Sequence, residues 1–344
     1  MKIAIGISGL SMYDAMSNDA FGMGELFNRI GHQVTYYVDN PTINKPNILP
    51  FREAKPKDID LYIYHGWCSD EGVQLFQKLN CRKIVKYHNY TPLHFFKNEY
   101  DIYLVNKAKE HIGILVNHDE IWVDSTFNGE GLKELKRDIK YDVVPPYNQV
   151  DVLIAEPDLT RIFRLDETST NILMVGRVVN HKNILLGIDA FNTYLQYNYN
   201  ANLLISGEHD IEYSELVKTR INELILNDKV FVMHKTSLCM LKALYNMSDL
   251  LLITSKHEGF CVPIVEAMAL GLPVLLTNRE TSLPYTGGDA VGYSESEEPK
   301  FIAKGIKRII ENREHHIKAG QERFNSKFSN KVIDSIILKL LYRC

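Results

Sequence analysis

The fold of this chain is decided by one stretch, Leu250-Leu251-Leu252-Ile253 followed by Glu258-Gly259-Phe260-Cys261-Val262-Pro263-Ile264-Val265-Glu266. The apolar run predicts a buried strand, and Pro263 fits the first turn of a helix, where its missing N–H costs nothing. Gly271 fits the end of that helix, with Pro273 beyond it. The stretch therefore predicts a strand, a loop and a helix of a parallel α/β sheet.

Two glutamates frame this loop and the start of the helix. We expect Glu258 on the loop at the carboxyl end of the strand and Glu266 in the first turn of the helix. Ligands of open α/β sheets bind at that edge. Helix amides bind an anion and carboxylates accept hydrogen bonds from hydroxyls, a combination that suits a nucleotide-sugar. The alternative is that both glutamates only cap the helix and favour its dipole.

Composition excludes several classes of protein. The 344 residues are 45% apolar and 24% charged, which is typical of a soluble chain with room for two domains. A net charge of −4 lacks the excess of basic residues that is typical of nucleic-acid-binding proteins. The five cysteines have no paired spacing, which argues against disulfides and a zinc site and favours a reducing compartment. No segment reaches the roughly 18 apolar residues of a membrane span, so we expect a cytoplasmic protein.

Peripheral membrane contact stays open because of one basic cluster. Lys133, Lys136, Arg137 and Lys140 lie on one predicted helix. The cluster is either a solvated helix face or a patch for anionic lipid head groups.

Predicted strands and helices alternate along the whole chain, which indicates parallel βαβ units and two doubly wound domains. A linker is expected near 146–160, between residues 1–150 and 151–327, and helical spacing over 330–341 predicts a final helix. The predicted strands are 2–7, 33–38, 61–64, 83–87 and 120–123 in the first half, and 171–175, 201–206, 229–233, 250–254 and 273–276 in the second.

The pattern EGF-x-x-P-x-x-EAMA-x-G-x-PV closely resembles glycosyltransferase family 4. The resemblance implies a GT-B fold, in which two Rossmann-like, doubly wound domains face each other across a cleft. Residues 1–150 would form the acceptor-side domain, joined by a C-terminal helix within 328–344, and residues 151–327 the nucleotide-sugar donor domain.

A basic pair supports the same resemblance. Arg177 and Lys182, five residues apart after the strand at 171–175, fall on the positions of the Arg and Lys of the family. Cations there would stabilise the negative charge that grows on the departing nucleotide diphosphate. The family usually has Gly after this Lys, but here Asn183 follows, and Asn can also take a positive φ. Taken alone, both cations would be interpreted as ordinary surface residues that follow a strand; together with the acid pair they are not.

Two first-domain residues are carried over from the family. His88, in His88-Asn89-Tyr90-Thr91-Pro92 after a strand, corresponds to a His that reaches the reacting sugar; the alternative is a structural His that caps the next turn. Gly22 is expected before a helix, where donor phosphate would approach the backbone, although Met23 splits it from Gly24.

The resemblance also assigns roles in the second domain. Glu266 would bind ribose hydroxyls, and Glu258 would bind a donor-sugar hydroxyl and help to align the anomeric carbon. The backbone amides of Phe260, Cys261 and Val262 would meet phosphate or sugar, with Cys261 in place of the common Gly. His88, Arg177, Lys182 and Glu258 are the expected catalytic residues.

The expected activity is that of a hexosyltransferase that retains anomeric configuration. It would move a sugar from a UDP-, GDP- or ADP-sugar to a hydroxyl of a glycan or lipid-linked glycan. No metal or other cofactor is expected, because the sequence offers no hard-cation ligands at suitable spacing. The alternatives are a GT-B-like sugar phosphorylase or epimerase, a catalytically silent interaction module and, from the first-domain glycines, a nicotinamide oxidoreductase.

Overall fold

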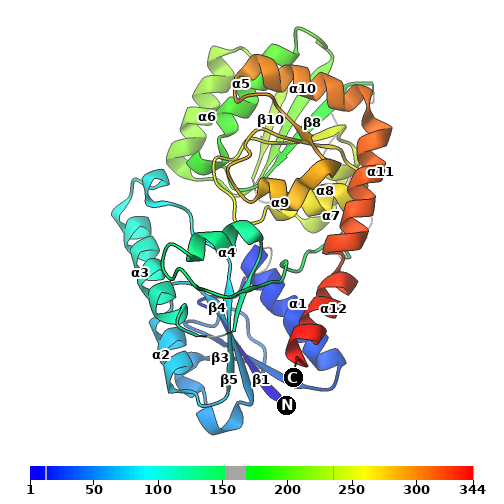
Figure 1. The fold of residues 1–344 in the computed structure, drawn as a ribbon. Helices are drawn as coiled ribbons and strands as arrows, with labels where there is room; N and C mark the ends of the chain where they lie inside the picture. Colours follow the sequence, from blue (N-terminus) through cyan, green and yellow to red (C-terminus); the bar gives the residue numbers. More distant parts are fainter. Residues whose placement is uncertain (12–13, 119, 152, 154–167, 235, 344) are drawn as a thin grey trace. The chain divides into compact units, whose positions relative to one another are not determined.

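The computed structural model describes residues 1–11, 14–118, 120–151, 153, 168–234 and 236–343. The chain divides into two compact units (Figure 1), the first formed by Met1–Asn148 with Phe328–Cys344 and the second by Gln149–Lys327. Of the linker predicted near 146–160, residues 152 and 154–160 lie outside the described residues.

The first unit is built on a seven-stranded parallel sheet of order β3-β2-β1-β4-β5-β6-β7. Its strands are β1 Lys2–Gly6, β2 Gln33–Val38, β3 Ile48–Pro50, β4 Leu61–Gly66, β5 Arg82–Tyr87, β6 Ile121–Val123 and β7 Asp142–Val143. Its helices are α1 Ala15–Arg29, α2 Asp70–Lys78, α3 Glu99–Leu115, α4 Thr126–Leu132 and α12 Asn330–Leu341, with 3-10 turns at Phe51–Glu53, Pro56–Asp58 and Leu93–Phe95.

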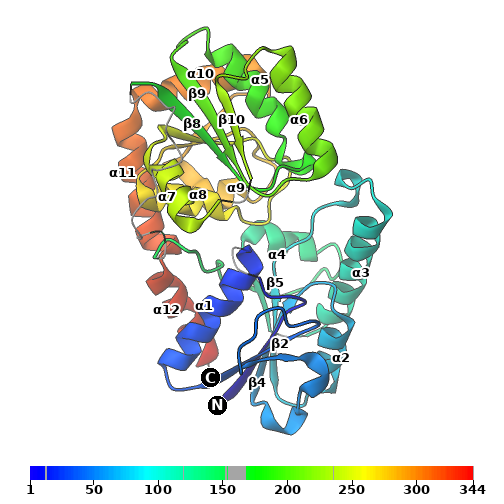
Figure 2. The ribbon, with the colours of Figure 1, turned by 180° about the vertical axis from the view of Figure 1, so that it is seen from behind.

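Both faces of this sheet are covered, and strand β4 shows why its sequence is apolar throughout. Leu61 and Ile63 point into the core shared with α1 and α12, whereas Tyr62 and Tyr64 point into the core shared with α2 and α3. Such a strand has no solvent face. Figure 2 shows α12 beside α1, where Ile333 and Ile337 join the same core and Asp334 pairs with Arg29. The final helix thus belongs to the first unit.

The second unit contains a six-stranded parallel sheet of order β10-β9-β8-β11-β12-β13. Its strands are β8 Thr170–Val175, β9 Ala201–Ser206, β10 Val230–Met233, β11 Leu250–Ile253, β12 Val274–Leu276 and β13 Gly292–Tyr293. Its helices are α5 Ile184–Tyr194, α6 Ile211–Glu223, α7 Leu238–Asn246, α8 Val262–Leu270, α9 Leu283–Gly287, α10 Pro299–Glu311 and α11 Arg313–Arg323. Two 3-10 turns lie at Asn180–Lys182 and Gly288–Ala290, and a π-helical turn at Phe324–Phe328 ends the α11 segment.

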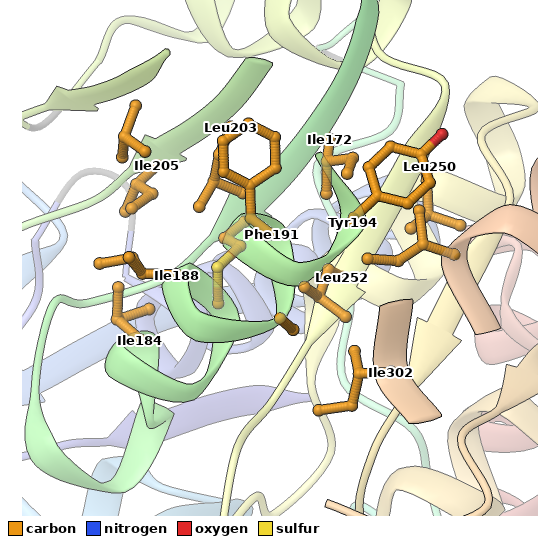
Figure 3. Packing of buried hydrophobic residues seen from close by; sticks show 14 of the residues in the cluster. Ile172, Ile184, Ile188, Phe191, Tyr194, Leu203, Ile205, Leu250, Leu252 and Ile302 are labelled. Carbon is orange, nitrogen blue, oxygen red and sulfur yellow. The ribbon is translucent and has the colours of Figure 1, made fainter. Parts of the chain in front are cut away.

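The core on one face of this sheet is formed by strands β8, β9 and β11 together with helices α5, α6 and α10. Figure 3 shows Phe191 of α5 beside Leu203 of β9, and Ile302 of α10 beside Leu252 of β11. These side chains are almost fully buried, so a rigid, close-packed layer covers this face of the sheet.

All ten predicted strands are confirmed, with ends that differ by at most two residues. The strands that the sequence did not predict, β3, β7 and β13, contain only two or three residues each. So short a segment does not show the periodicity on which a prediction from sequence depends.

The prediction that the basic cluster lies on one helix is wrong. Helix α4 ends at Leu132, and residues 133–140 form turns and irregular backbone. Gly129 and Gly131 lie near the end of α4 and weaken the helix just before the basic residues. Lys133 pairs with Glu130 at 2.7 Å on the surface. Among the described residues, no helix combines the length and apolar character that crossing a bilayer requires.

Candidate active site

The candidate site lies at the switch point of the second unit's sheet. From β8 the chain proceeds to β9 and β10 on one side, and β11 pairs with β8 on the other side. The loops that follow β8 and β11 therefore leave the sheet in opposite directions at its carboxyl edge, where ligands of open α/β sheets bind. Arg177 and Lys182 follow β8, and Glu258 follows β11, so the topology brings the predicted cations and the first acid to one place.

Lys182 and Glu258 form a direct ion pair. Lys182 Nζ lies 2.6 Å from Glu258 Oε1, and Ser255 Oγ donates a hydrogen bond of 2.7 Å to the same oxygen. Asn183 stands where the family usually has Gly, and it adopts the left-handed backbone conformation expected there, with φ +54°. The Thr254 hydroxyl donates to the carbonyls of Lys182 and Asn183, which fixes this turn against the end of β11.

The pair keeps Glu258 ionised although the side chain is buried. Burial alone would raise the pKa of Glu258, but the Lys182 ammonium and the Ser255 hydroxyl together lower it below the usual range. Desolvation, helped by the charges of Lys182 and Arg177, lowers the pKa of His181 to about 3. At neutral pH these two loops therefore hold an anion, two cations and an uncharged imidazole.

Glu266 sits in a different environment. It is the fifth residue of α8, which begins at Val262, so the prediction that it lies in the first turn was one turn too early. Tyr245 of α7 donates a hydrogen bond of 2.7 Å to Oε2 of Glu266, and both side chains are buried. Burial raises the pKa of Glu266, and the Tyr245 bond offsets only part of that rise.

The backbone before α8 has an unusual conformation. Cys261 precedes the helix with φ +73°, a left-handed value that costs a residue with a Cβ about 1 to 2 kcal/mol. This explains why the resembled pattern has Gly here, because only Gly adopts such a φ without cost. The Cys261 side chain is buried, and burial raises the pKa of its thiol, which makes the thiol unreactive.

His88 lies in the first unit, just beyond the end of β5. Its Nδ1 lies 2.9 Å from Asp124 Oδ2 and its Nε2 lies 2.8 Å from His65 Nδ1. His65 is fully buried, and His88 is slightly exposed. His88 is therefore held by two side chains at a sheet edge and does not cap a turn through its ring.

Gly22 is misplaced in the sequence prediction. Helix α1 begins at Ala15, capped by Asp14, whose carboxylate accepts from the Ser17 N–H at 2.9 Å. Gly22 thus lies in the interior of the helix, where the backbone N–H is used within the helix and cannot meet a phosphate. A Cβ on Gly22 would lie 2.3 Å from the Tyr147 ring, so this glycine is required for packing.

Replacing Gly22 by alanine is expected to destabilise the protein by about 1 to 3 kcal/mol through overpacking against Tyr147. Urea unfolding measures the change. The matched control is Gly113→Ala in α3, where a Cβ meets nothing within 4 Å and a gain of about 0.5 to 1 kcal/mol is expected. Equal stability of Gly22→Ala and wild type would contradict the packing role.

Several contact residues were missed in the sequence. Tyr245 and Ser255 carry no pattern that distinguishes them from other residues near strand ends. Lys86 does not stand out either, because Arg82 and Lys83 of the same strand β5 are also charged. Its partners Asp19 and Asp124 come from other elements, and only folding brings them within reach.

The chain is similar in sequence to known glycosyltransferases. Residues 156–325, just under half of the chain, match the family model of glycosyl transferases group 1. The capsular polysaccharide biosynthesis glycosyltransferase CapM of Staphylococcus aureus is 28% identical over 169 residues, 46% of this chain and 42% of that protein. The O-antigen chain mannosyltransferase RfbU of Salmonella typhimurium is 28% identical over 144 residues, 41% of this chain and 40% of that protein. The chain thus spans about two fifths of these relatives.

Solved structures match over the full length of the chain. Sucrose-phosphate synthase from Thermosynechococcus elongatus superposes with a TM-score of 0.76 at 15% identity, covering 99% of this chain and 98% of that one. Anabaena HepE, solved in complex with UDP and glucose, gives a TM-score of 0.75 at 15% identity and covers 99% of both chains. The two parallel-sheet α/β units therefore have the fold of GT-B glycosyltransferases, as the sequence predicted.

Proposed function

We propose that this protein is a retaining, metal-independent glycosyltransferase of family 4 that uses a nucleotide-diphosphate sugar as donor. The observation that carries the proposal is the Lys182–Glu258 pair at the switch point, with Ser255 on the same carboxylate oxygen. A buried acid that stays ionised beside fixed cations suits a ligand with both hydroxyls and phosphate. The match of residues 156–325 to glycosyl transferases group 1 supports it.

In the proposed mechanism each side chain has one task. Arg177 and Lys182 hold the diphosphate and stabilise the charge that grows on it as the glycosidic bond breaks. Glu258 accepts a hydrogen bond from a donor-sugar hydroxyl, and Glu266 accepts from the ribose hydroxyls. No side chain is assigned as a covalent nucleophile, so the acceptor hydroxyl attacks from the face that the diphosphate leaves, and the departing phosphate takes its proton.

The donor and acceptor classes are supported by the named relatives. HepE and a trehalose-6-phosphate protein of E. coli were solved with UDP-glucose and UDP-2-fluoro-glucose, which makes UDP-sugars the first donors to test. CapM and RfbU are named for capsular polysaccharide and O-antigen chains, which favours a glycan or lipid-linked glycan as acceptor.

A panel of UDP-, GDP- and ADP-sugars tests the proposal. We expect one donor class to raise the melting temperature and to be turned over, with release of the nucleoside diphosphate that depends on acceptor. NMR of the product should show the donor's anomeric configuration retained. No stabilisation and no turnover with any donor would overturn the proposal.

Metal independence makes a separate prediction. Turnover in EDTA should equal turnover in Mg²⁺ because Arg177 and Lys182 supply the positive charge. Loss of activity in EDTA that Mg²⁺ restores would contradict it.

Glu266→Gln is expected to weaken donor binding by about 10- to 100-fold, since it replaces an ionised acceptor of hydroxyl protons by an amide. It should also stabilise the free protein at neutral pH. The raised pKa of Glu266 means that its ionisation opposes folding, so the advantage of Gln grows as pH rises above the ordinary Glu value and vanishes in acid. Calorimetric Kd values and unfolding free energies at pH 4 and 8 measure both effects, and unchanged donor affinity would count against the assignment.

A further inference from the structure

Five ionisable side chains of the first unit meet beneath the carboxyl edge of its sheet. They come from four places in the chain: α1, β4, β5 with the residue after it, and the end of β6. All but one are buried, and the remaining one, His88, is only slightly exposed. The members are Asp19, His65, Lys86, His88 and Asp124, and we refer to them as the buried charge cluster.

Asp124 is the centre of the cluster's strongest contacts. Its Oδ1 pairs with Lys86 Nζ, and its Oδ2 lies 2.9 Å from His88 Nδ1. Lys86 Nζ also donates to the Val144 carbonyl at 2.5 Å, which fixes the ammonium. Burial alone would raise the pKa of Asp124, but His88 and Lys86 together lower it, so Asp124 is a carboxylate that can only accept.

An acceptor at this position determines where the proton of His88 lies. Because Asp124 can only accept, Nδ1 of His88 must carry a hydrogen. The second nitrogen, Nε2, then remains for another contact, and in this structure it faces His65 Nδ1 at 2.8 Å. Burial, together with the positive charge of Lys86, lowers the pKa of His65 well below its usual range, so His65 is neutral.

A metal ion is the competing occupant of this cluster. Asp19 Oδ2, His65 and His88 offer ligand atoms within 4.8 Å of one another. However, the Lys86 ammonium lies 3.6 Å from Asp19 Oδ2 and already supplies positive charge there. The 2.8 Å separation of the two imidazole nitrogens is that of a hydrogen bond, which requires a proton between them. Geometry and charge both favour a proton.

We propose that Asp124, held by Lys86, is a positioning residue that fixes the Nδ1-protonated form of His88. The Nε2 atom of His88 is then available to the donor sugar, and His65 contacts this atom when the sugar is absent. The role of His88 toward the sugar rests on the proposed function and on the resemblance to family 4, which places a His near the reacting sugar. The tautomer does not, because it follows from contacts within the first unit.

The first experiment reads the tautomer without any assay of activity. Long-range proton–nitrogen NMR on histidine-labelled wild-type protein, with His88→Gln to assign the signals, is expected to show His88 protonated at Nδ1. In Asp124→Asn the amide can donate as well as accept, so the tautomer preference of His88 should shift. Asp70→Asn is the matched control, because it removes the carboxylate that lies 2.9 Å from His111 Nε2 and should leave His88 unchanged. A wild-type His88 with a bare Nδ1 would overturn the proposal even if Asp124→Asn failed to fold.

The second experiment is a double-mutant cycle on turnover. Asp124→Asn is expected to lower kcat about 10- to 100-fold, the usual effect of losing a group that orients a functional histidine. In a His88→Ala background the same substitution should cost nothing further, because its effect passes through His88. Additive losses would show that Asp124 is merely structural.

The third experiment tests whether the buried charge cluster binds zinc. Elemental analysis of the purified protein is expected to show no stoichiometric metal. Titration with zinc alone is expected to show no stoichiometric binding that a His65 substitution removes. Stoichiometric zinc held by this cluster would overturn the proton assignment. Absence of transfer by the wild type with every donor would refute the proposed function instead, and the NMR result would still decide the tautomer.

Discussion

Lys182→Ala is expected to lower kcat by about 100- to 1,000-fold, the usual loss when one fixed charge at a developing anion is removed. The effect should fall on kcat more than on KM, because the negative charge on the leaving diphosphate is greatest in the transition state. Steady-state kinetics with the donor identified by the panel measure both constants. A variant with wild-type kcat would contradict the role of Lys182.

The matched control is Lys218→Ala. Lys218 pairs with Glu215 at the same 2.6 Å, but that pair lies on the surface of α6 with both side chains about two-thirds exposed. An exposed pair contributes about 0 to 1 kcal/mol and nothing to the site, so turnover should not change. Comparing kcat of the two variants distinguishes the general effect of removing a paired lysine from the specific effect of removing Lys182.

Lys182→Ala also changes the response to acid. The folded pKa of Glu258 is lowered, so its contribution to stability is complete above its ordinary pKa of 4.5 and is lost as pH falls through the folded value. Without Lys182 that contribution disappears. The difference in unfolding free energy between wild type and variant should therefore be largest near neutral pH and shrink below about pH 4.5.

Gly207→Ala is the second substitution with a large expected effect. A Cβ on Gly207 would lie 1.9 Å from the carbonyl oxygen of Gly176, and neither backbone is free to move. Gly176 N–H donates to Ser206, and Gly207 N–H donates to Met233, at the ends of paired strands. We expect destabilisation of about 3 kcal/mol or more, at the upper end for overpacking because the clash is with backbone. Arg177 follows Gly176 directly, so kcat should fall as well.

Gly305→Ala provides the comparison for this clash. A Cβ there would lie 3.1 Å from a methyl of Leu275, a side-chain tip that can shift by a few tenths of an ångström. The expected change in unfolding free energy is below about 1 kcal/mol, with turnover unchanged. Equal effects of the two substitutions would show that the Gly176–Gly207 approach does not constrain the site.

The sequence was most informative where a strand is followed by a loop with functional residues. Leu250–Ile253 and the segment that ends at Gly271 predicted a strand, a loop and a helix, and the structure has each of them, with Gly271 left-handed at φ +74°. These features are local, because apolar runs, proline at a helix start and glycine at a helix end act over a few residues.

The sequence misled where tertiary packing overrides local preference. Gly22 and Gly24 indicated a loop, yet both lie inside α1. Glycine is needed at these helical positions because Tyr147 and Tyr36 occupy the space that a larger side chain would fill. A glycine weakens an isolated helix but permits this close approach. No pattern near Gly22 reveals a tyrosine 125 residues away in the chain.

By itself, then, the sequence determined the alternation of strands and helices, the loop positions of Arg177, Lys182, Glu258 and His88, and hence the class of fold. Only the tertiary structure decided the partners: Glu258 with Lys182, Glu266 with Tyr245, and His88 with Asp124 and His65. Secondary structure follows from neighbours along the chain. The charge and hydrogen bonding of a buried group depend on side chains from distant elements, which become neighbours only when the sheets form.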